Sequence, residues 1–95
     1  MKTFLIQRDV PGAGKLTSWE RKKLAQRSCQ VLELMGPDQI QWVHSYITSD
    51  NLWCIYKAQN EELIREHARR GGFPVNHIHE VFGMFSPATT ELVLD

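Results

Sequence analysis

The chain has 95 residues and a mass of 11.0 kDa, which suits one domain and is too short for two. Its eleven Lys and Arg residues balance eleven Asp and Glu residues, so no overall positive field draws it to nucleic acid or to an anionic membrane. A hydrophobic fraction of 42% and a charged fraction of 23% are typical of folded globular proteins. We therefore expect a single domain over residues 1–95, with neither nucleic acid nor a membrane as partner.

The sequence also indicates where the protein works. No apolar run approaches the length of a membrane helix, and the apolar start of the chain ends at Gln7, Arg8 and Asp9 without the pattern of a signal peptide. Cys29 and Cys54 are too few for a disulfide framework. These features predict a cytoplasmic protein with two free thiols.

The hydrophobic pattern predicts six elements. Alternating β-formers predict strands, and apolar residues at helical spacing predict helices, the first of which follows the capping-box sequence Thr17-Ser18-Trp19-Glu20. Gly36-Pro37 ends the first helix and Gly71-Gly72 ends the second. In chain order, the expected elements are a strand at 3–9, a helix at 18–35, strands at 40–48 and 52–58, a helix at 61–70 and a strand at 77–86.

The order β-α-β-β-α-β is that of an α+β ferredoxin-like fold, in which two helices cover one face of a four-stranded antiparallel sheet. In a single subunit, no helix covers the other face of the sheet. A second copy packed sheet to sheet would cover it, so we expect a homodimer. Residues 87–95 form a C-terminal extension, and its Leu92-Val93-Leu94 could add a fifth strand to either subunit.

The strand at residues 40–48 carries three rings at alternate positions. Strict alternation places Trp42, His44 and Tyr46 on one face. We assign this face to the open side of the sheet, because the small and aliphatic residues between the rings suit the helices.

The face of the next strand depends on its turn. If Thr48 pairs with Leu52, Cys54 and Tyr56 join the rings on the open face, and we favour this register. If Asp50-Asn51 is instead a two-residue turn, Ile55 and Lys57 take those places. In the favoured register, the set Trp42, His44, Tyr46, Cys54 and Tyr56 would line a cavity between two facing sheets. A His–Cys couple in this set could act as a nucleophile and its base or as two metal ligands.

The histidines are the candidate metal ligands. His77 and His79 flank Ile78, so on a strand both imidazoles point to one face about 7 Å apart, near enough to share a metal. His44 or His67 could complete the site from either subunit, although a lone histidine in an apolar helical stripe, as at His67, is typical of the core. Residues 71–95 carry three acidic residues and no Lys or Arg, which favours a divalent cation at this end of the chain.

Two further features have simpler interpretations. Gly12-Ala13-Gly14-Lys15 lacks the length and the hydroxyl residue of a phosphate-binding loop, so we interpret it as a flexible connection. The start of the first helix carries Lys15, Arg21, Lys22, Lys23 and Arg27. Such a run is usually a solvated face, but it could also bind an acidic partner.

Read in order, several short motifs resemble a known family. They are WVHSY from residue 42, CIYKA from 54, IREHAR from 64, GFP from 72, IHEV from 78 and PAT from 87. Together they are similar to small bacterial nickel-binding proteins of ferredoxin-like fold, within a broader family of uncharacterised domains, over nearly the whole chain. The resemblance implies a dimer that holds Ni²⁺ at its surface, with a role in nickel sequestration or tolerance. It does not imply an enzyme.

Three functional hypotheses follow. The first is a non-enzymatic nickel-binding dimer that uses His77 and His79. The second is a dimeric α+β barrel that binds or transforms a small molecule between its sheets, with His44 as acid or base. The third is a structural or protein-interaction domain that uses the basic start of the first helix.

Overall fold

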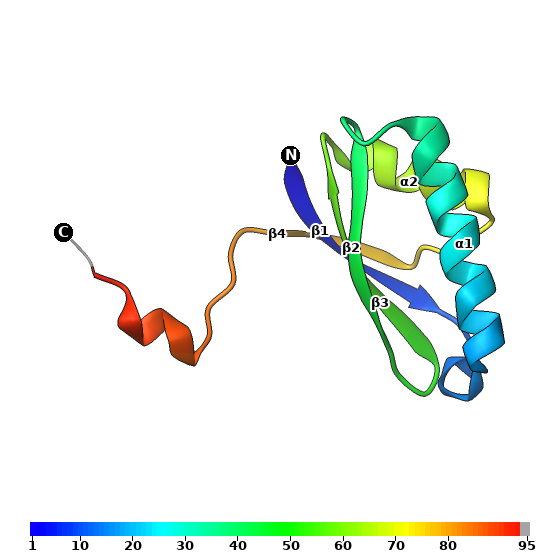
Figure 1. The fold of residues 1–95 in the computed structure, drawn as a ribbon, viewed down its shortest axis with the longest axis horizontal. Coiled ribbons are helices and arrows are strands. Elements are labelled where there is room, and N and C mark those ends of the chain that lie inside the picture. The colour runs from blue at the N-terminus through cyan, green and yellow to red at the C-terminus, as the bar shows by residue number, and fades with distance from the viewer. Residues whose placement is uncertain (94–95) are drawn as a thin grey trace.

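The computed structural model describes residues 1–93 and has the predicted ferredoxin-like architecture (Figure 1). Four antiparallel strands lie in the order β2-β3-β1-β4, and both helices pack against one face of the sheet. The elements are β1 (Lys2–Asp9), η1 (Ala13–Lys15), α1 (Ser18–Met35), β2 (Ile40–Ile47), β3 (Asn51–Ala58), α2 (Glu61–Gly71), β4 (His77–Val81) and η2 (Pro87–Glu91).

Local sequence signals set the ends of the helices. Thr17 caps α1 by accepting a hydrogen bond from the Glu20 backbone, while the Glu20 carboxylate accepts one from the Thr17 backbone. Asn60 caps α2 because its side-chain oxygen accepts a hydrogen bond from the Leu63 backbone N–H. Gly72 ends the helix and has a left-handed backbone conformation at φ 70°. The predicted helices are therefore confirmed to within one residue. No helix within residues 1–93 is long and apolar enough to cross a membrane.

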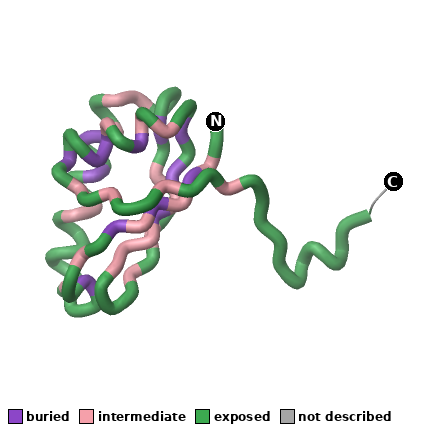
Figure 2. The backbone as a smooth tube through the Cα atoms, turned by 180° about the vertical axis from the view of Figure 1, so that it is seen from behind, coloured by how far each residue is buried: buried purple, intermediate pink, exposed green. Residues whose placement is uncertain are grey.

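The core lies between the helices and the inner face of the sheet, where Figure 2 shows the buried segments. Alternation along β1 points Phe4 and Ile6 inward, opposite Tyr56 and Cys54 of β3. From α2, Ile64 packs against them with no exposed surface. Arg8 continues the same inward row and is buried with it.

A β-bulge at Val43 changes which side chains of β2 lie on the open side of the sheet. Strict alternation would keep Trp42 and His44 together, but the pairing of β2 with β3 shifts between them. Because the extra residue inverts the alternation, Trp42 points toward the helices while His44 and Tyr46 remain on the open face. The predicted triad is therefore wrong for Trp42.

The favoured hairpin register is also wrong. Ile47 pairs with Leu52, and the turn is closed by a 3.0 Å hydrogen bond from the Thr48 backbone to the Asn51 carbonyl, so the two turn residues are Ser49 and Asp50. This register turns Cys54 and Tyr56 inward, where both are buried. The alternative placement of Ile55 and Lys57 on the open face is the one found, although its predicted pairing was off by two residues.

The turn is held by contacts with the connection after β1. Gly12 donates a backbone hydrogen bond to the Asp50 carboxylate at 3.0 Å, and Gly14 donates one to the Ser49 carbonyl at 3.0 Å. A Cβ on Gly14 would lie 3.1 Å from the Cα of Ser49. Gly14 therefore permits a close approach of two backbone segments, whereas Gly12 adopts a left-handed backbone conformation at φ 77°.

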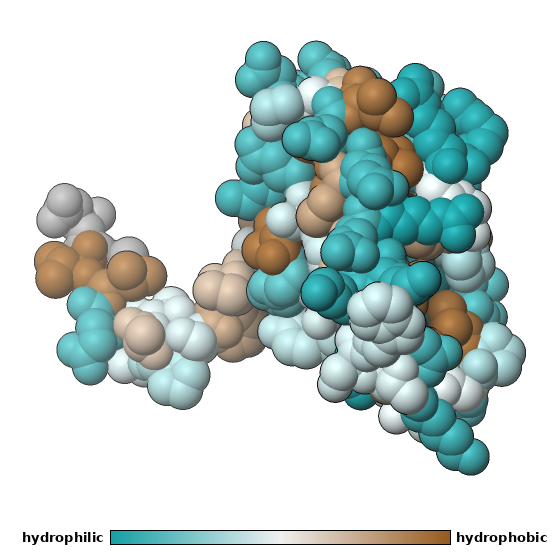
Figure 3. All heavy atoms as spheres, turned by 45° about the vertical axis from the view of Figure 1, so that its right-hand side comes forward, coloured by the Kyte–Doolittle hydropathy of each residue, from teal (hydrophilic) through white to brown (hydrophobic). Residues whose placement is uncertain are grey.

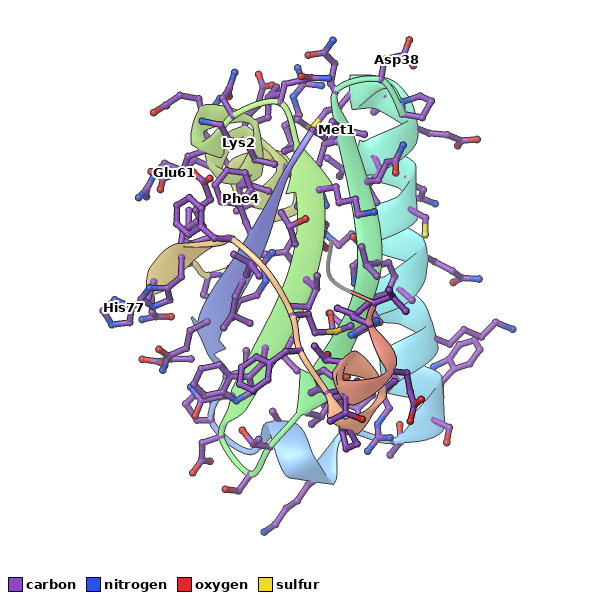
Figure 4. The ribbon with its side chains drawn as sticks, turned by 90° about the vertical axis from the view of Figure 1, so that its left-hand side faces the viewer. Met1, Lys2, Phe4, Asp38, Glu61 and His77 are labelled. Carbon is purple, nitrogen blue, oxygen red and sulfur yellow. The ribbon has the colours of Figure 1, made fainter. Side chains whose placement is uncertain are left out.

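The open face, as we call the uncovered side of the sheet, is partly apolar and faces the viewer in Figure 4. The pairing of the strands places these residues on it: Thr3, Leu5, Gln7, His44, Tyr46, Trp53, Ile55, Lys57, His77, His79 and Val81.

The C-terminal arm, residues 82–93, extends away from the domain (Figures 1 and 2). β4 ends at Val81 rather than at the predicted Ser86, and Pro87–Glu91 form a 3₁₀ helix instead of a strand. Leu94 lies outside the described residues. Phe82, Met84 and Phe85 are 91%, 90% and 88% exposed, and Figure 3 shows hydrophobic side chains along the arm.

The packing of α2 against the sheet predicts a large stability difference between two substitutions. Ile64→Ala should lower the free energy of unfolding by about 2–5 kcal/mol, because Ile64 is fully buried. Leu34→Ala, at a side chain that is 79% exposed on α1, should change it by less than about 0.5 kcal/mol. Urea unfolding measures both, and equal losses would contradict the assigned inner face of α2.

Candidate functional site

His77 and His79 stand side by side on the open face at the β4 edge of the sheet. Their ring centroids are 6.1 Å apart and their planes differ by 24°. Both side chains are exposed, so their rotamers are free to adjust to a ligand. The predicted pair is therefore brought together by the strand, as its spacing implies.

His44 lies in the same row of the sheet as His79 but at the opposite edge. The row runs from His44 through Ile55 and Leu5 to His79, which is three strand spacings, or about 14 Å. His44 instead packs edge-on against Tyr46, with ring centroids 5.0 Å apart. One subunit therefore does not bring His44 and His79 to a single ion.

His67 lies on the other side of the sheet, in the core. Its Nε2 is 3.1 Å from the Ser28 hydroxyl, which is in turn 3.0 Å from the Tyr56 hydroxyl. Burial, and secondly the positive charge of Arg8, lower the pKa of His67 to about 4. Near neutral pH, His67 is thus a neutral core histidine that the structure does not bring to His77 and His79.

The two imidazoles at His77 and His79 are an incomplete donor set. Within residues 1–93, no three His, Cys, Asp or Glu side chains are grouped so that they could hold a metal. Glu80 points to the other face and lies 3.9 Å from the Lys2 ammonium. Imidazole is nevertheless a suitable ligand for nickel and copper, so the pair offers two of the several ligands that such an ion requires.

Three of the five residues predicted to line a ligand pocket instead line a cavity on the inner side of the sheet. A cavity of about 250 Å³ lies between α1 and the inner face of the sheet. Trp42, Cys54 and Tyr56 line it, whereas His44 and Tyr46 lie on the opposite face. The predicted set is therefore divided between the two faces of the sheet.

A largely buried cluster adjoins this cavity. The sequence pointed to Tyr56 and His67 as candidate residues but did not predict the group. We call it the Arg8 cluster: Arg8, Ser28, Tyr56, His67 and Phe73. The Arg8 guanidinium carbon lies 5.9 Å from the centroid of the Tyr56 ring and 5.5 Å from that of the Phe73 ring. Its Nη1 donates a 2.8 Å hydrogen bond to the Pro74 carbonyl. Burial raises the pKa of Tyr56 to about 12, so its hydroxyl stays protonated.

Two sequence signals could have revealed this cluster. Arg8 continues the alternation of Phe4 and Ile6, which predicts an inward side chain. The sequence Gly71-Gly72-Phe73-Pro74 places the Phe73 ring where a Cβ on Gly71 would collide with it. The glycine therefore makes room for a ring that packs on Arg8.

Comparison with known proteins places this fold in a family. A family model described as "Nickel responsive protein SCO4226-like" matches residues 4–81. The chain belongs to this family. A solved structure described as "Crystal structure analysis of SCO4226 from Streptomyces coelicolor A3(2)" aligns with a TM-score of 0.73 and 17% identity, over 87% of this chain and 99% of that chain. This likeness confirms the fold. No curated protein matches the chain.

The buried His67 predicts a pH-dependent stability. Its pKa is about 4 in the folded state against 6.5 for a free histidine, so the unfolded chain takes up the proton first on acidification. The stability contributed by neutral His67 should be complete above about pH 6.5 and should fall progressively toward about pH 4. Urea unfolding of the wild type and of His67→Gln across this range measures it. Parallel pH profiles for the two proteins would contradict the expectation.

Proposed function

We propose that this protein is a non-enzymatic Ni²⁺-binding homodimer that serves nickel sequestration or tolerance in the cytoplasm. The observation that carries the proposal is the pair of exposed, adjacent imidazoles at His77 and His79. Membership of a family described as nickel responsive supports nickel as the metal. In this proposal nickel is the cargo of the protein, and no residue is assigned a catalytic role.

The chemistry of the pair suits a reversible surface site. Neutral imidazole nitrogens are good ligands for nickel, and water or carboxylate can occupy the remaining positions of an octahedral ion. Because a protonated imidazole cannot coordinate, acid should release the ion. Both rings must rotate for their nitrogens to meet one ion, and their exposure permits this.

A second copy can supply the missing ligands. Packed sheets lie about 10 Å apart, so side chains from two facing sheets can meet between them. A two-fold axis parallel to the strands would bring His44 of one copy toward His79 of the other, because the two residues share a row. An in-plane axis perpendicular to the strands would instead bring the two His77–His79 pairs together.

The apolar character of the open face supports the dimer. Leu5, Trp53 and Ile55 are only half-buried in a single subunit. The C-terminal arm adds five exposed apolar side chains, those of Phe82, Met84, Phe85, Leu92 and Val93. Monomeric proteins rarely expose large contiguous apolar patches. We therefore propose that the open faces of two copies pack together, with the arm covering part of the partner.

The barrel hypothesis loses most of its support. Only His44 and Tyr46 of its five lining residues lie on the open face, because the Val43 bulge and the Ser49-Asp50 turn direct the others inward. At the basic start of α1, Lys22 and Lys23 remain exposed, with Lys23 stacked over Trp19 at 5.0 Å, and no acidic partner is proposed for these two residues.

Nickel titration calorimetry tests the metal site. The double variant His77→Ala/His79→Ala should lose most of the Ni²⁺ binding of the wild type, because both protein ligands are removed. His67→Gln is the control, since that histidine lies on the other side of the sheet. Equal binding by the wild type and the double variant would remove the site from His77 and His79. Loss of binding in His44→Ala would indicate a site shared between two copies.

Sedimentation equilibrium tests the dimer. The wild type should sediment at twice the 11.0 kDa mass of the chain, and Ile55→Glu should sediment as a monomer, because it places a charge within the apolar open face. Leu34→Glu, on the exposed side of α1, should remain dimeric. A monomeric wild type would refute the proposed assembly while leaving the metal test intact.

A further inference from the structure

We infer that the cavity between α1 and the sheet is a binding site for a small organic carboxylate with an apolar body, whose negative charge is recognised by Arg8. This site lies on the opposite side of the sheet from His77 and His79. It is independent of the proposed nickel function and would exist in each subunit.

The burial of Arg8 is the first reason. Its side chain lines the cavity and the residue is 2% exposed, yet among residues 1–93 no carboxylate lies within ion-pair distance of it. Nη1 donates to the Pro74 carbonyl, whereas Nη2 has no hydrogen-bond partner in the described chain. Arginine stays charged under all ordinary conditions, and a buried charge without a counter-ion is strongly unfavourable.

The Tyr56 and Phe73 rings compensate part of this cost. They flank the guanidinium and attract it through their faces. They cannot accept the in-plane hydrogen bonds that the guanidinium offers at Nη2. A carboxylate can do so, because its two oxygens match the planar fork of arginine. The cluster therefore holds a cation and leaves one of its donors, Nη2, without a partner among residues 1–93.

The charge and polarity of the cavity are the second reason. Its charged lining residues within the described chain are Arg8 and Arg21, and it has no acidic lining residue there. Most of the wall is apolar, from Leu24, Leu52 and Trp42. Such a lining suits an anion carried on an apolar body, since the body gains from burial and the charged lining residues are both positive.

The sequence of α1 explains why the space exists. The face of α1 toward the sheet carries Ala25 and Ser28 where larger apolar residues would fill the gap. Only Ser28 and Val31 of this helix are buried. Leu24, Ser45 and Leu52 are half-buried, so the cavity opens to solvent and a ligand can enter. At about 250 Å³ it is smaller than sites for drug-sized ligands, which points to a single ring or a short alkyl chain.

Titration with benzoate, compared with its neutral analogue benzamide, tests the inference. Benzoate should bind once per subunit and more tightly than benzamide, because only the anion pairs with Arg8. Arg8→Met should weaken benzoate binding by about tenfold or more, and Ala25→Leu should weaken both ligands, since it narrows the cavity and leaves the guanidinium in place. The second variant keeps the test valid if Arg8→Met fails to fold.

Two matched controls separate this site from surface effects. Arg69→Met removes an arginine from the exposed surface of α2, and Lys22→Met removes a charge from α1 outside the cavity. Both should bind benzoate like the wild type. The inference would be overturned if benzamide bound as tightly as benzoate, or if Ala25→Leu bound both ligands like the wild type. It would also be overturned if the protein bound inorganic phosphate but not benzoate. An absence of binding to the wild type would overturn it as well. Ni²⁺ binding should be unchanged in Ala25→Leu, so each proposal can fail separately.

Discussion

The docking of the Ser49-Asp50 turn against the glycines after β1 is the constraint on which the rest of the structure depends. Hydrogen bonds from the Gly12 and Gly14 backbones hold the turn, and the turn sets the register of the β2–β3 hairpin. A shift of one residue would exchange the two faces of either strand. The turn therefore decides that Cys54 and Tyr56 enter the core while Trp53 and Ile55 remain on the open face.

The inward position of Tyr56 in turn organises the polar centre of the core. Its hydroxyl meets Ser28 of α1, and Ser28 meets His67 of α2. This chain links the sheet to both helices across their packing interface. Arg8 lies against the face of the same tyrosine, and its positive charge helps to keep His67 neutral. The polar side chains in the centre thus position one another. Two of their nitrogen atoms, Arg8 Nη2 and His67 Nδ1, lack hydrogen-bond partners in the described chain.

The two faces of the sheet offer different chemistry. The open face presents exposed imidazoles beside half-buried apolar residues, which favours a metal ion and a second copy of the chain. The inner face presents a buried guanidinium beside an apolar cavity, which favours an organic anion. Because the sheet separates these surfaces, the two proposed ligands would not compete for the same residues. Any coupling between them would have to pass through the strands, with β1 the most direct route because Leu5 and Gln7 face the histidines while Arg8 faces the cavity.

The sequence by itself determined the element order, the helix limits, the ferredoxin-like fold and the shared face of His77 and His79. These features depend on capping residues, glycines and periodicity, which act over a few neighbouring residues. The tertiary structure decided the face of Trp42, the hairpin register, the partners of His67 and the cavity beside Arg8. A bulge of one residue and a turn held by distant glycines reverse which side chains are buried, and alternation alone does not encode either event. For the same reason the sequence could indicate that Arg8 points inward, but only the packing of α1 left it beside an open space.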